Sequence, residues 1–286
     1  MPLVGLIDER GKEITWAKIK KGMGKFVDPL PVLLALYQDR ESYCDFSITE
    51  LINDPYQLQM TRRYDYFESV DQLADRMFGS AFHCALEQGG ALKGMETECR
   101  MSVKIKGIVI GGTCDLILHD EEGITDYKTV TMSKLRMIQK GKADALDSYT
   151  KQLNGYRFMH WKKTGDDYDT LKARLFVRDW RFYEFRRAGQ DYMMYPRGLN
   201  LEVPTMPMKK IAEWMEDRTA QHVVAERVED EELHTVGECA STWGGLRCTN
   251  YCPVSDICHF RLMNPVEEKT TTPLKTAKVS KKKEKK

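Results

Sequence analysis

The sequence lacks the long apolar stretches and the leader-like start that are typical of membrane and secreted proteins. No segment approaches the roughly 20 consecutive apolar residues of a membrane-spanning helix, so we predict that the chain does not span a membrane. The first ten residues contain no basic start followed by an apolar run, which predicts no secretory signal and a cytoplasmic location. In a reducing cytoplasm, the eight cysteines are expected to be free thiols or metal ligands rather than disulfides.

The chain also lacks an internal repeat and a G-x-x-x-x-G-K-[ST] phosphate-binding loop. The missing loop excludes a P-loop motor such as a helicase within this sequence. Hydrophobic residues make up 42% and charged residues 30% of the 286 residues, which is ordinary for a globular protein. The length suits one large domain or two small ones.

A strong net charge is absent too. The overall charge of +1 is the sum of an acidic body and a basic C-terminal tail. Residues 265–286 contain eight lysines and three glutamates, a charge of +5, which leaves the preceding residues at −4. This tail has almost nothing apolar to bury, so we predict that it is disordered. It is either a solubilising terminus or a basic arm that attracts phosphates.

Hydrophobic periodicity predicts an α/β protein with helices at both ends and strands in the middle. Residues 47–50 have the form of a capping box, and Pro55 suits the first turn of the next helix. Asp71 is expected to cap a longer helix that carries Gly79 and His83 on one face, where the glycine lets another backbone approach closely. The predicted helices span 30–38, 47–53, 55–64, 71–88, 146–162 and 207–228, and the predicted strands span 98–105, 107–118, 123–131 and 171–180.

Basic residues outside the tail occur in two places. Arg62 and Arg63 end the 55–64 helix, where they either contact phosphates or are simply solvated. Residues 132–144 form a polar and basic stretch that could contact phosphates independently.

The most informative segment, residues 112–129, predicts a strand, an acidic turn and a second strand. If the turn is centred on residues 120–121, Asp115 lies directly opposite Asp126, and Lys128 shares the face of Asp126. The apolar residues expected on the other face are Leu116, Leu118 and Ile124. Opposed carboxylates have β-carbons about 5 Å apart and repel each other.

This repulsion indicates a compensating cation. Lys128 supplies one positive charge, and a divalent cation between Asp115 and Asp126 would supply the rest. Hard oxygen ligands favour Mg²⁺ or Mn²⁺. The alternative is a surface salt-bridge cluster of the same three side chains. Gln152 and Tyr156 lie four residues apart on a predicted helix, so they either face this site together or form an ordinary surface pair.

Four short motifs, in this order, resemble those of the PD-(D/E)XK nuclease superfamily, and specifically its RecB-like exonuclease branch, which includes CRISPR-associated and phage enzymes. They are Gly79-Ser-Ala-Phe-His83, Gly112-Thr-Cys-Asp115, Asp126-Tyr-Lys128 and Gln152-Leu-Asn-Gly-Tyr156. The resemblance covers roughly residues 45–260. It departs from the superfamily pattern at Cys114, where a proline would precede the first acidic residue.

The resemblance implies a restriction-endonuclease-like core, a mixed central sheet flanked by helices, with a helical N-terminal elaboration and a Cys-rich C-terminal segment. The implied ligands of Mg²⁺ or Mn²⁺ are His83, Asp115, Asp126 and the main-chain carbonyl of Tyr127. The implied catalytic residues are Lys128, Asp115, Asp126, Gln152 and Tyr156. The implied reaction is phosphodiester hydrolysis in DNA, because a bound metal can neutralise the phosphate and activate a water.

A cluster of cysteines follows, with the pattern C-x₈-C-x₃-C-x₅-C formed by Cys239, Cys248, Cys252 and Cys258. Turn-rich segments between them let the thiolates converge on zinc or an iron–sulfur cluster. Because similar nucleases carry such a cluster after the nuclease motifs, the resemblance favours [4Fe–4S], with zinc as the alternative. Their first ligand corresponds to Asp54 here, so Cys239 is the expected substitute and Cys44 the other candidate.

We therefore predict a single nuclease domain over residues 1–264, followed by the tail. Its predicted parts are a helical part at 28–70, a nuclease core at 71–205, and a helix with the Cys cluster at 206–264. The predicted function is a metal-dependent DNA exonuclease acting on single strands or free ends in recombination, repair or phage replication. The alternatives are a non-catalytic DNA-binding or scaffold module with a Cys₄ metal site, and a site-specific endonuclease of the same fold. A helicase or recombinase partner would be a separate protein, and the expected location is the cytoplasm of a bacterium or a phage-infected host.

Overall fold

The computed structural model describes residues 3–37, 42–89, 92–141, 143–193, 195–230, 232–236, 247–248 and 252–258. The chain divides into two compact units, Met1–Cys239 and Ala240–Lys286. The predicted basic tail lies outside the described residues.

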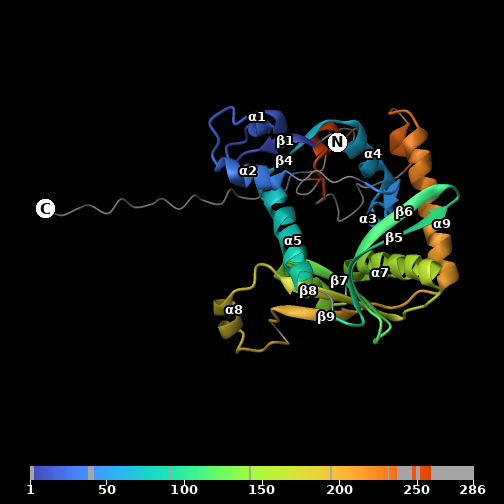
Figure 1. Cartoon of the computed structure of the whole chain (residues 1–286). Helices are drawn as coiled ribbons and strands as arrows, with labels where there is room; N and C mark the ends of the chain where they lie inside the picture. The colour runs from blue at the N-terminus through green and yellow to red at the C-terminus, as the bar shows by residue number, and fades with distance from the viewer. Residues whose placement is uncertain are drawn as a thin grey trace. The chain divides into compact units, whose positions relative to one another are not determined.

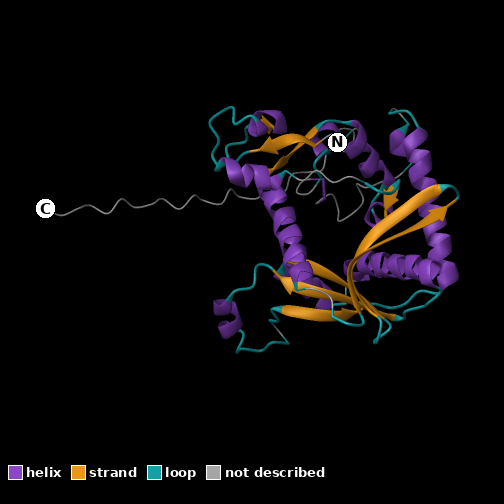
Figure 2. Ribbon diagram, viewed as in Figure 1, coloured by secondary structure: helices purple, strands orange, loops and turns teal. Residues whose placement is uncertain are grey.

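The secondary structure mixes helices and strands along the whole first unit (Figure 2). The strands are β1 (Leu3–Ile7), β2 (Glu13–Thr15), β3 (Phe46–Ser47), β4 (Tyr66–Ser69), β5 (Met95–Ile105), β6 (Ile108–Leu118), β7 (Gly123–Val130), β8 (Thr170–Val177) and β9 (Gly198–Glu202). The α-helices are α1 (Trp16–Lys20), α2 (Leu30–Leu36), α3 (Ile48–Ile52), α4 (Pro55–Arg63), α5 (Val70–Gln88), α6 (Met132–Gln139), α7 (Ala143–Thr164), α8 (Phe182–Arg187) and α9 (Met208–Arg227).

A small sheet with the strand order β2-β1-β4 lies in the N-terminal part, where the sequence predicted only helices (Figure 1). Strand β1 pairs antiparallel with β2 and parallel with β4. Its strands have only three to five residues, too few for a clear alternating pattern. The core beneath it comprises Leu6, Ile14, Trp16, Ile19, Leu33, Leu36 and Leu73.

The central sheet has six strands of mixed direction, in the order β3-β6-β7-β8-β9, with β5 paired to the remaining edge of β6. Strands β5 and β6 are joined by a two-residue turn in which Lys106 and Gly107 have φ values of 49° and 93°. Positive φ at both positions is typical of a type I′ turn, and glycine adopts it readily. The turn places Ile105 opposite Ile108 and so sets the register of the long hairpin.

Strand β6 changes neighbours along one edge. It pairs with β7 only at residues 116–118 and with β3 at residues 110–111. The β6–β7 pairs include Leu116–Thr125, so the hairpin has the predicted register. The prediction for Ile124 was wrong, since Ile124 pairs with Ile117 and shares the parity of Asp126. Figure 1 shows β5 and β6 turning away from β7, β8 and β9 beyond this point.

Helices flank the central sheet, as the sequence predicted. Helices α6 and α7 connect the parallel strands β7 and β8. Helix α7 packs against β5, β7 and β8, while α5 packs against β7. Phe82 of α5 contacts Phe176 of β8, with ring centroids 4.4 Å apart. Among the described helices, none combines the length and apolar character needed to cross a lipid bilayer.

Several boundaries differ from the prediction, since β5 begins at Met95 rather than 98, α7 begins at Ala143 rather than 146, and β8 ends at Val177 rather than 180. Helix α5 is capped by Ser69, whose hydroxyl accepts a hydrogen bond from the Gln72 amide at 3.2 Å, while Asp71 lies in the first turn. The basic stretch at 132–144 begins with helix α6, capped by Thr131. Its buried residues recur every third position, at Met132, Leu135 and Ile138.

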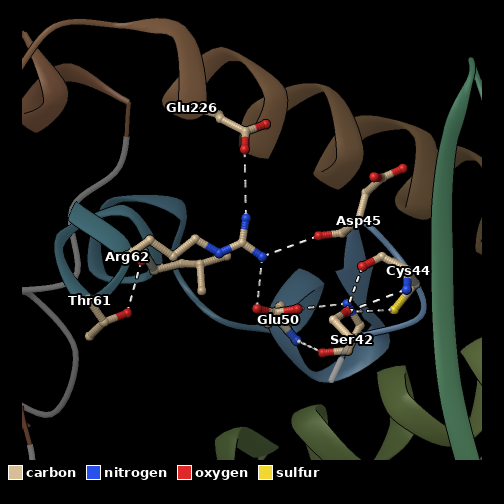
Figure 3. A network of polar contacts seen from close by, with 9 residues as sticks. Ser42, Cys44, Asp45, Glu50, Thr61, Arg62 and Glu226 are labelled. Carbon is tan, nitrogen blue, oxygen red and sulfur yellow. Dashed lines mark hydrogen bonds and ion pairs between the residues drawn. The ribbon is translucent and has the colours of Figure 1, made fainter. Parts of the chain in front are cut away.

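Arg62 and Arg63, at the end of α4, hold neighbouring elements together rather than facing solvent. Arg62 donates to Glu50 at 2.9 Å and to the carbonyl of Asp45 at 3.2 Å, and lies 3.8 Å from the Glu226 carboxylate (Figure 3). Arg63 donates to the main-chain carbonyl of Glu226 at 3.2 Å. Both arginines are therefore engaged mainly by the protein itself. Neither of the two predicted roles, phosphate contact or simple solvation, is their main one.

Candidate metal centre

Asp115 lies where β6 separates from β7, and it contacts two other elements. One carboxylate oxygen accepts a hydrogen bond from the Tyr127 amide of β7 at 2.5 Å. The other lies 3.0 Å from Nδ1 of His83 on α5. The hydrogen bond to Asp115 raises the pKa of His83, and burial opposes this effect. The sequence motifs at 79–83 and 112–115 are thus in direct contact.

Glu98 of β5 completes this group, although the sequence analysis did not select it. Ligand atoms of His83, Glu98 and Asp115 all lie within 4.8 Å of one another, and no other such group of three occurs in the described part of the chain. Glu98 stands opposite Asp115, between the pairs Thr97–Leu116 and Cys99–Cys114, and has a φ of 49°. Burial, followed by the charge of Asp115, raises the pKa of Glu98.

The second predicted acidic residue, Asp126, is 3% exposed and forms an ion pair of 2.5 Å with Lys128. Burial raises the pKa of Asp126 to about 6, and the Lys128 ammonium acts in the opposite direction. The Asp115 carboxylate adds to the increase. Asp126 is not one of the three residues of the compact group, which are His83, Glu98 and Asp115.

Acidic residues thus lie on three neighbouring strands. Glu98 of β5 is opposite Asp115 of β6, and Asp126 of β7 follows the last β6–β7 pair, Leu116–Thr125, close enough to Asp115 for the two charges to interact. One imidazole and one ammonium are the basic groups in contact with them. Neighbouring carboxylates repel unless a cation compensates. One nitrogen and two oxygen donors within 4.8 Å form a donor set that fits Mg²⁺ or, with its greater tolerance of imidazole, Mn²⁺.

Gln152 and Tyr156 lie on α7 and are both buried. The Gln152 amide donates a hydrogen bond to the Tyr156 hydroxyl at 2.9 Å. Burial raises the pKa of the Tyr156 phenol well above its usual value, and the negative charge of Asp126 contributes. The same two causes raise the pKa of Tyr149, one α7 turn before Gln152, to about 12. This side of α7 thus presents neutral hydroxyl groups within electrostatic reach of Asp126, and the pair is not an exposed one.

The described cysteines of the second unit are Cys248 and Cys258, which are buried, and Cys252, which is partly exposed. Burial raises the pKa of Cys252, and the other two thiols raise it further. Cys239 lies outside the described residues. Cys44 belongs to the first unit, where its sulfur lies 3.8 Å from the Ser42 hydroxyl (Figure 3).

Comparisons with known proteins add weak similarities. No protein-family model matches the sequence, and no curated protein matches it. The crystal structure of a protein designated SSO0001 is similar with a TM-score of 0.46 and 17% identity, over 80% of this chain and 91% of that chain. A phage related exonuclease from Haemophilus somnus 129PT is similar with a TM-score of 0.31 and 15% identity, over 52% of this chain and 71% of that chain.

Proposed function

We propose that this chain is a metal-dependent DNA nuclease of the PD-(D/E)XK type, acting as a RecB-like exonuclease on a restriction-endonuclease-like core. One observation carries the proposal. The Asp115 carboxylate forms hydrogen bonds both with His83 and with the main chain of β7, the strand that carries Asp126 and Lys128. These contacts lie at the point where β6 and β7 separate. Three motifs that are distant in the sequence thereby meet at one site.

The proposed ligands of Mg²⁺ or Mn²⁺ are His83, Glu98, Asp115, Asp126 and the carbonyl of Tyr127. When bound, the metal would neutralise phosphate charge and favour ionisation of a water. Binding would also favour the ionised form of Asp126, whose pKa burial raises to about 6. Lys128, with its side chain 26% exposed, can then orient the attacking water or stabilise charge on the phosphate. Gln152 and Tyr156 would support this site from α7.

A non-catalytic DNA-binding or scaffold module is the alternative from another class. Burying Asp126 beside a second carboxylate costs free energy. A surface that only binds DNA would gain nothing from this cost, which argues against the non-catalytic module. A site-specific endonuclease of the same fold would use the same residues, and only the products distinguish it from an exonuclease.

The test is digestion of single- and double-stranded DNA labelled at one end, with Mg²⁺, with Mn²⁺ and with EDTA. We expect cleavage that requires metal, releases nucleotides progressively from an end, and reports its polarity. Lys128→Ala should lower the rate about 10²–10³-fold, because it removes a charge contact made in the transition state. DNA binding should remain, since the basic residues of the 132–144 stretch would contact phosphates separately.

Lys172→Ala is the matched control. Lys172 lies on the neighbouring strand β8, is 30% exposed, and pairs with Glu121 at 3.3 Å. Its variant should cleave DNA at the normal rate. Full activity of Lys128→Ala would contradict the role assigned to that residue, and cleavage in EDTA would contradict the requirement for metal. DNA binding without any cleavage would favour the scaffold module.

The cysteines of the second unit are proposed to hold a [4Fe–4S] cluster, with zinc as the alternative and with Cys239 or Cys44 as the fourth ligand. Thiol ligands suit both, and ligation can supply folding free energy to a short loop-rich segment. Iron, sulfide and zinc analysis of anaerobically purified protein decides between them. A cytoplasmic location and a separate helicase or recombinase partner remain part of the proposal.

A further inference from the structure

A cavity of about 770 Å³ lies beside the candidate metal centre, between α5 and the strands β7, β8 and β9. Nothing in the proposed hydrolysis uses it. Its lining combines aromatic rings with arginines, namely Phe78, Phe82, Phe176, Arg174, Arg178 and Arg197. A cavity for a small apolar ligand would not need this many cationic groups.

The aromatic wall is open to solvent. Phe78 is 61% exposed, which is costly for a side chain with no partner to cover it. One helical turn later, Phe82 contacts Phe176, and both rings are only partly buried. The three rings form a surface on which a flat aromatic ligand can stack.

Two of the three arginines are not neutralised by an ion pair in the described part of the chain, although Asp75 and Asp179 also line the cavity. Arg178 pairs with Asp75, and Asp179 accepts a hydrogen bond from the backbone at the start of α6. Neither Arg174 nor Arg197 forms an ion pair within the described part of the chain. Arg174 lies 4.8 Å from the Phe176 ring, so charge and stacking surface are adjacent.

The cavity is connected to the metal centre through two residues. Phe82 directly precedes His83 on α5. Phe176 contacts the ring of Tyr127, with centroids 6.3 Å apart, and that ring lies 6.4 Å from the ring of His83, on the face of β7 opposite to Asp126 and Lys128. A strand whose phosphate reaches the metal centre would therefore have its neighbouring nucleotides at this cavity.

We propose that the cavity binds unpaired nucleotides of a single DNA strand, with bases stacked on the phenylalanines and phosphates held by Arg174 and Arg197. This inference rests on the proposed nuclease function, because the path of the strand toward the metal centre assumes cleavage there. It names single-stranded DNA as the substrate class. Aromatic stacking needs exposed base faces, which a duplex hides, whereas unpaired arginines attract any phosphate backbone. Their combination therefore selects single strands.

The experiment measures binding, not cleavage, in EDTA. The probe is a 12-nucleotide oligothymidylate with one internal 2-aminopurine, compared with the same strand in a duplex. We expect the wild-type protein to prefer the single strand and to quench the 2-aminopurine. Phe78→Ala should weaken single-strand binding about 5- to 100-fold and relieve the quenching. Arg197→Ala should weaken it and lower the salt dependence by about 0.7 in the log–log slope.

Phe182→Ala is the matched control, because Phe182 is also 61% exposed but does not line the cavity. It should bind the probe normally. The inference is overturned if Phe78→Ala and Arg197→Ala bind the single strand like the wild type, if Phe182→Ala loses as much affinity as Phe78→Ala, or if the duplex binds equally well. If the protein cleaves DNA but Phe78→Ala and Arg197→Ala bind the single strand normally, the nuclease proposal holds and the proposed role of the cavity is wrong. If the protein binds single strands selectively but does not cleave DNA, the proposed role of the cavity holds and the nuclease proposal is wrong.

Discussion

At the residue scale, Glu98 shows how one side chain joins a site that its own sequence context does not reveal. It has no motif around it, yet the turn at Lys106–Gly107 places it opposite Asp115. A lysine–glycine pair between two alternating strands is a recognisable two-residue turn, so counting back from it would have found Glu98. The left-handed φ of 49° there is unusual for a glutamate and is consistent with a functional constraint.

Glu98→Gln should therefore weaken metal binding. The amide keeps the size of the side chain but loses the negative charge, and we expect the dissociation constant for Mn²⁺ to rise at least about tenfold. Calorimetric titration of Mn²⁺ into the protein without DNA measures this. Glu96→Gln, two residues earlier on β5 and paired with His119, is the control and should bind normally. An unchanged affinity in Glu98→Gln would exclude it as a ligand.

At the element scale, two glycines on two helices have different surroundings. Gly155 of α7 faces Ile48 of α3, and a β-carbon there would overlap the Ile48 side chain. Gly79 of α5 has Thr129 as its nearest neighbour, and a β-carbon would lie 3.7 Å from the threonine hydroxyl, an ordinary contact. The close approach predicted at Gly79 is thus absent, while the glycine inside the 152–156 motif is the one that packing requires.

Gly155→Ala and Gly79→Ala should accordingly shift stability in opposite directions. Gly155→Ala should lower the free energy of unfolding by about 1–3 kcal/mol, because overpacking displaces the buried Ile48. Gly79→Ala should raise it by about 0.5–1 kcal/mol, since alanine is the better helix former and fits. Urea denaturation of the two variants beside the wild type measures both values. The same sign for both would contradict this account of α5 and α7.

At the scale of the whole first unit, His222 contributes to the pH dependence of stability. It is fully buried on α9, 5.3 Å from the Phe46 ring, and its ring nitrogens have at most a weak interaction with the main chain of Leu51, which opposes the lowering of its pKa. Burial lowers the pKa of His222 from 6.5 to about 4, and the charge of Arg218 adds to this. Glu50 of α3 and Arg62 of α4 act in opposite directions on it.

The unfolded chain therefore binds a proton at His222 at a higher pH than the folded chain does. Between pH 6.5 and 4, the unfolded state gains protons first, so the free energy of unfolding falls as the pH falls, by about 3 kcal/mol from this residue. Urea denaturation across this range should show the decrease, and His222→Leu should flatten it. Above pH 7, the two proteins should show parallel profiles. Equal slopes below pH 6.5 would contradict the role of His222.

The sequence by itself determined the features that depend on neighbours in the chain. The capping box of α3 forms as predicted, with the Ser47 hydroxyl accepting from the Glu50 amide and the Glu50 side chain accepting from the Ser47 amide. The β6–β7 hairpin has the predicted register, because an acidic turn between alternating strands has few other ways to close. The order of α5, strands β5 to β7, α7 and β8 followed from the same local periodicity, whereas α6, α8 and the edge strand β9 were not predicted.

Only the tertiary structure decided which distant groups meet. Burial and contacts across elements depend on packing, so the sequence could not show that Arg62 is engaged by Glu50 and Asp45, or that Phe78 stays exposed beside a cavity. The short strands of the N-terminal sheet are stabilised by pairing over a shared core rather than by a pattern of their own. Glu98 likewise becomes part of a site only because β5, β6 and α5 converge, and convergence is a property of the fold.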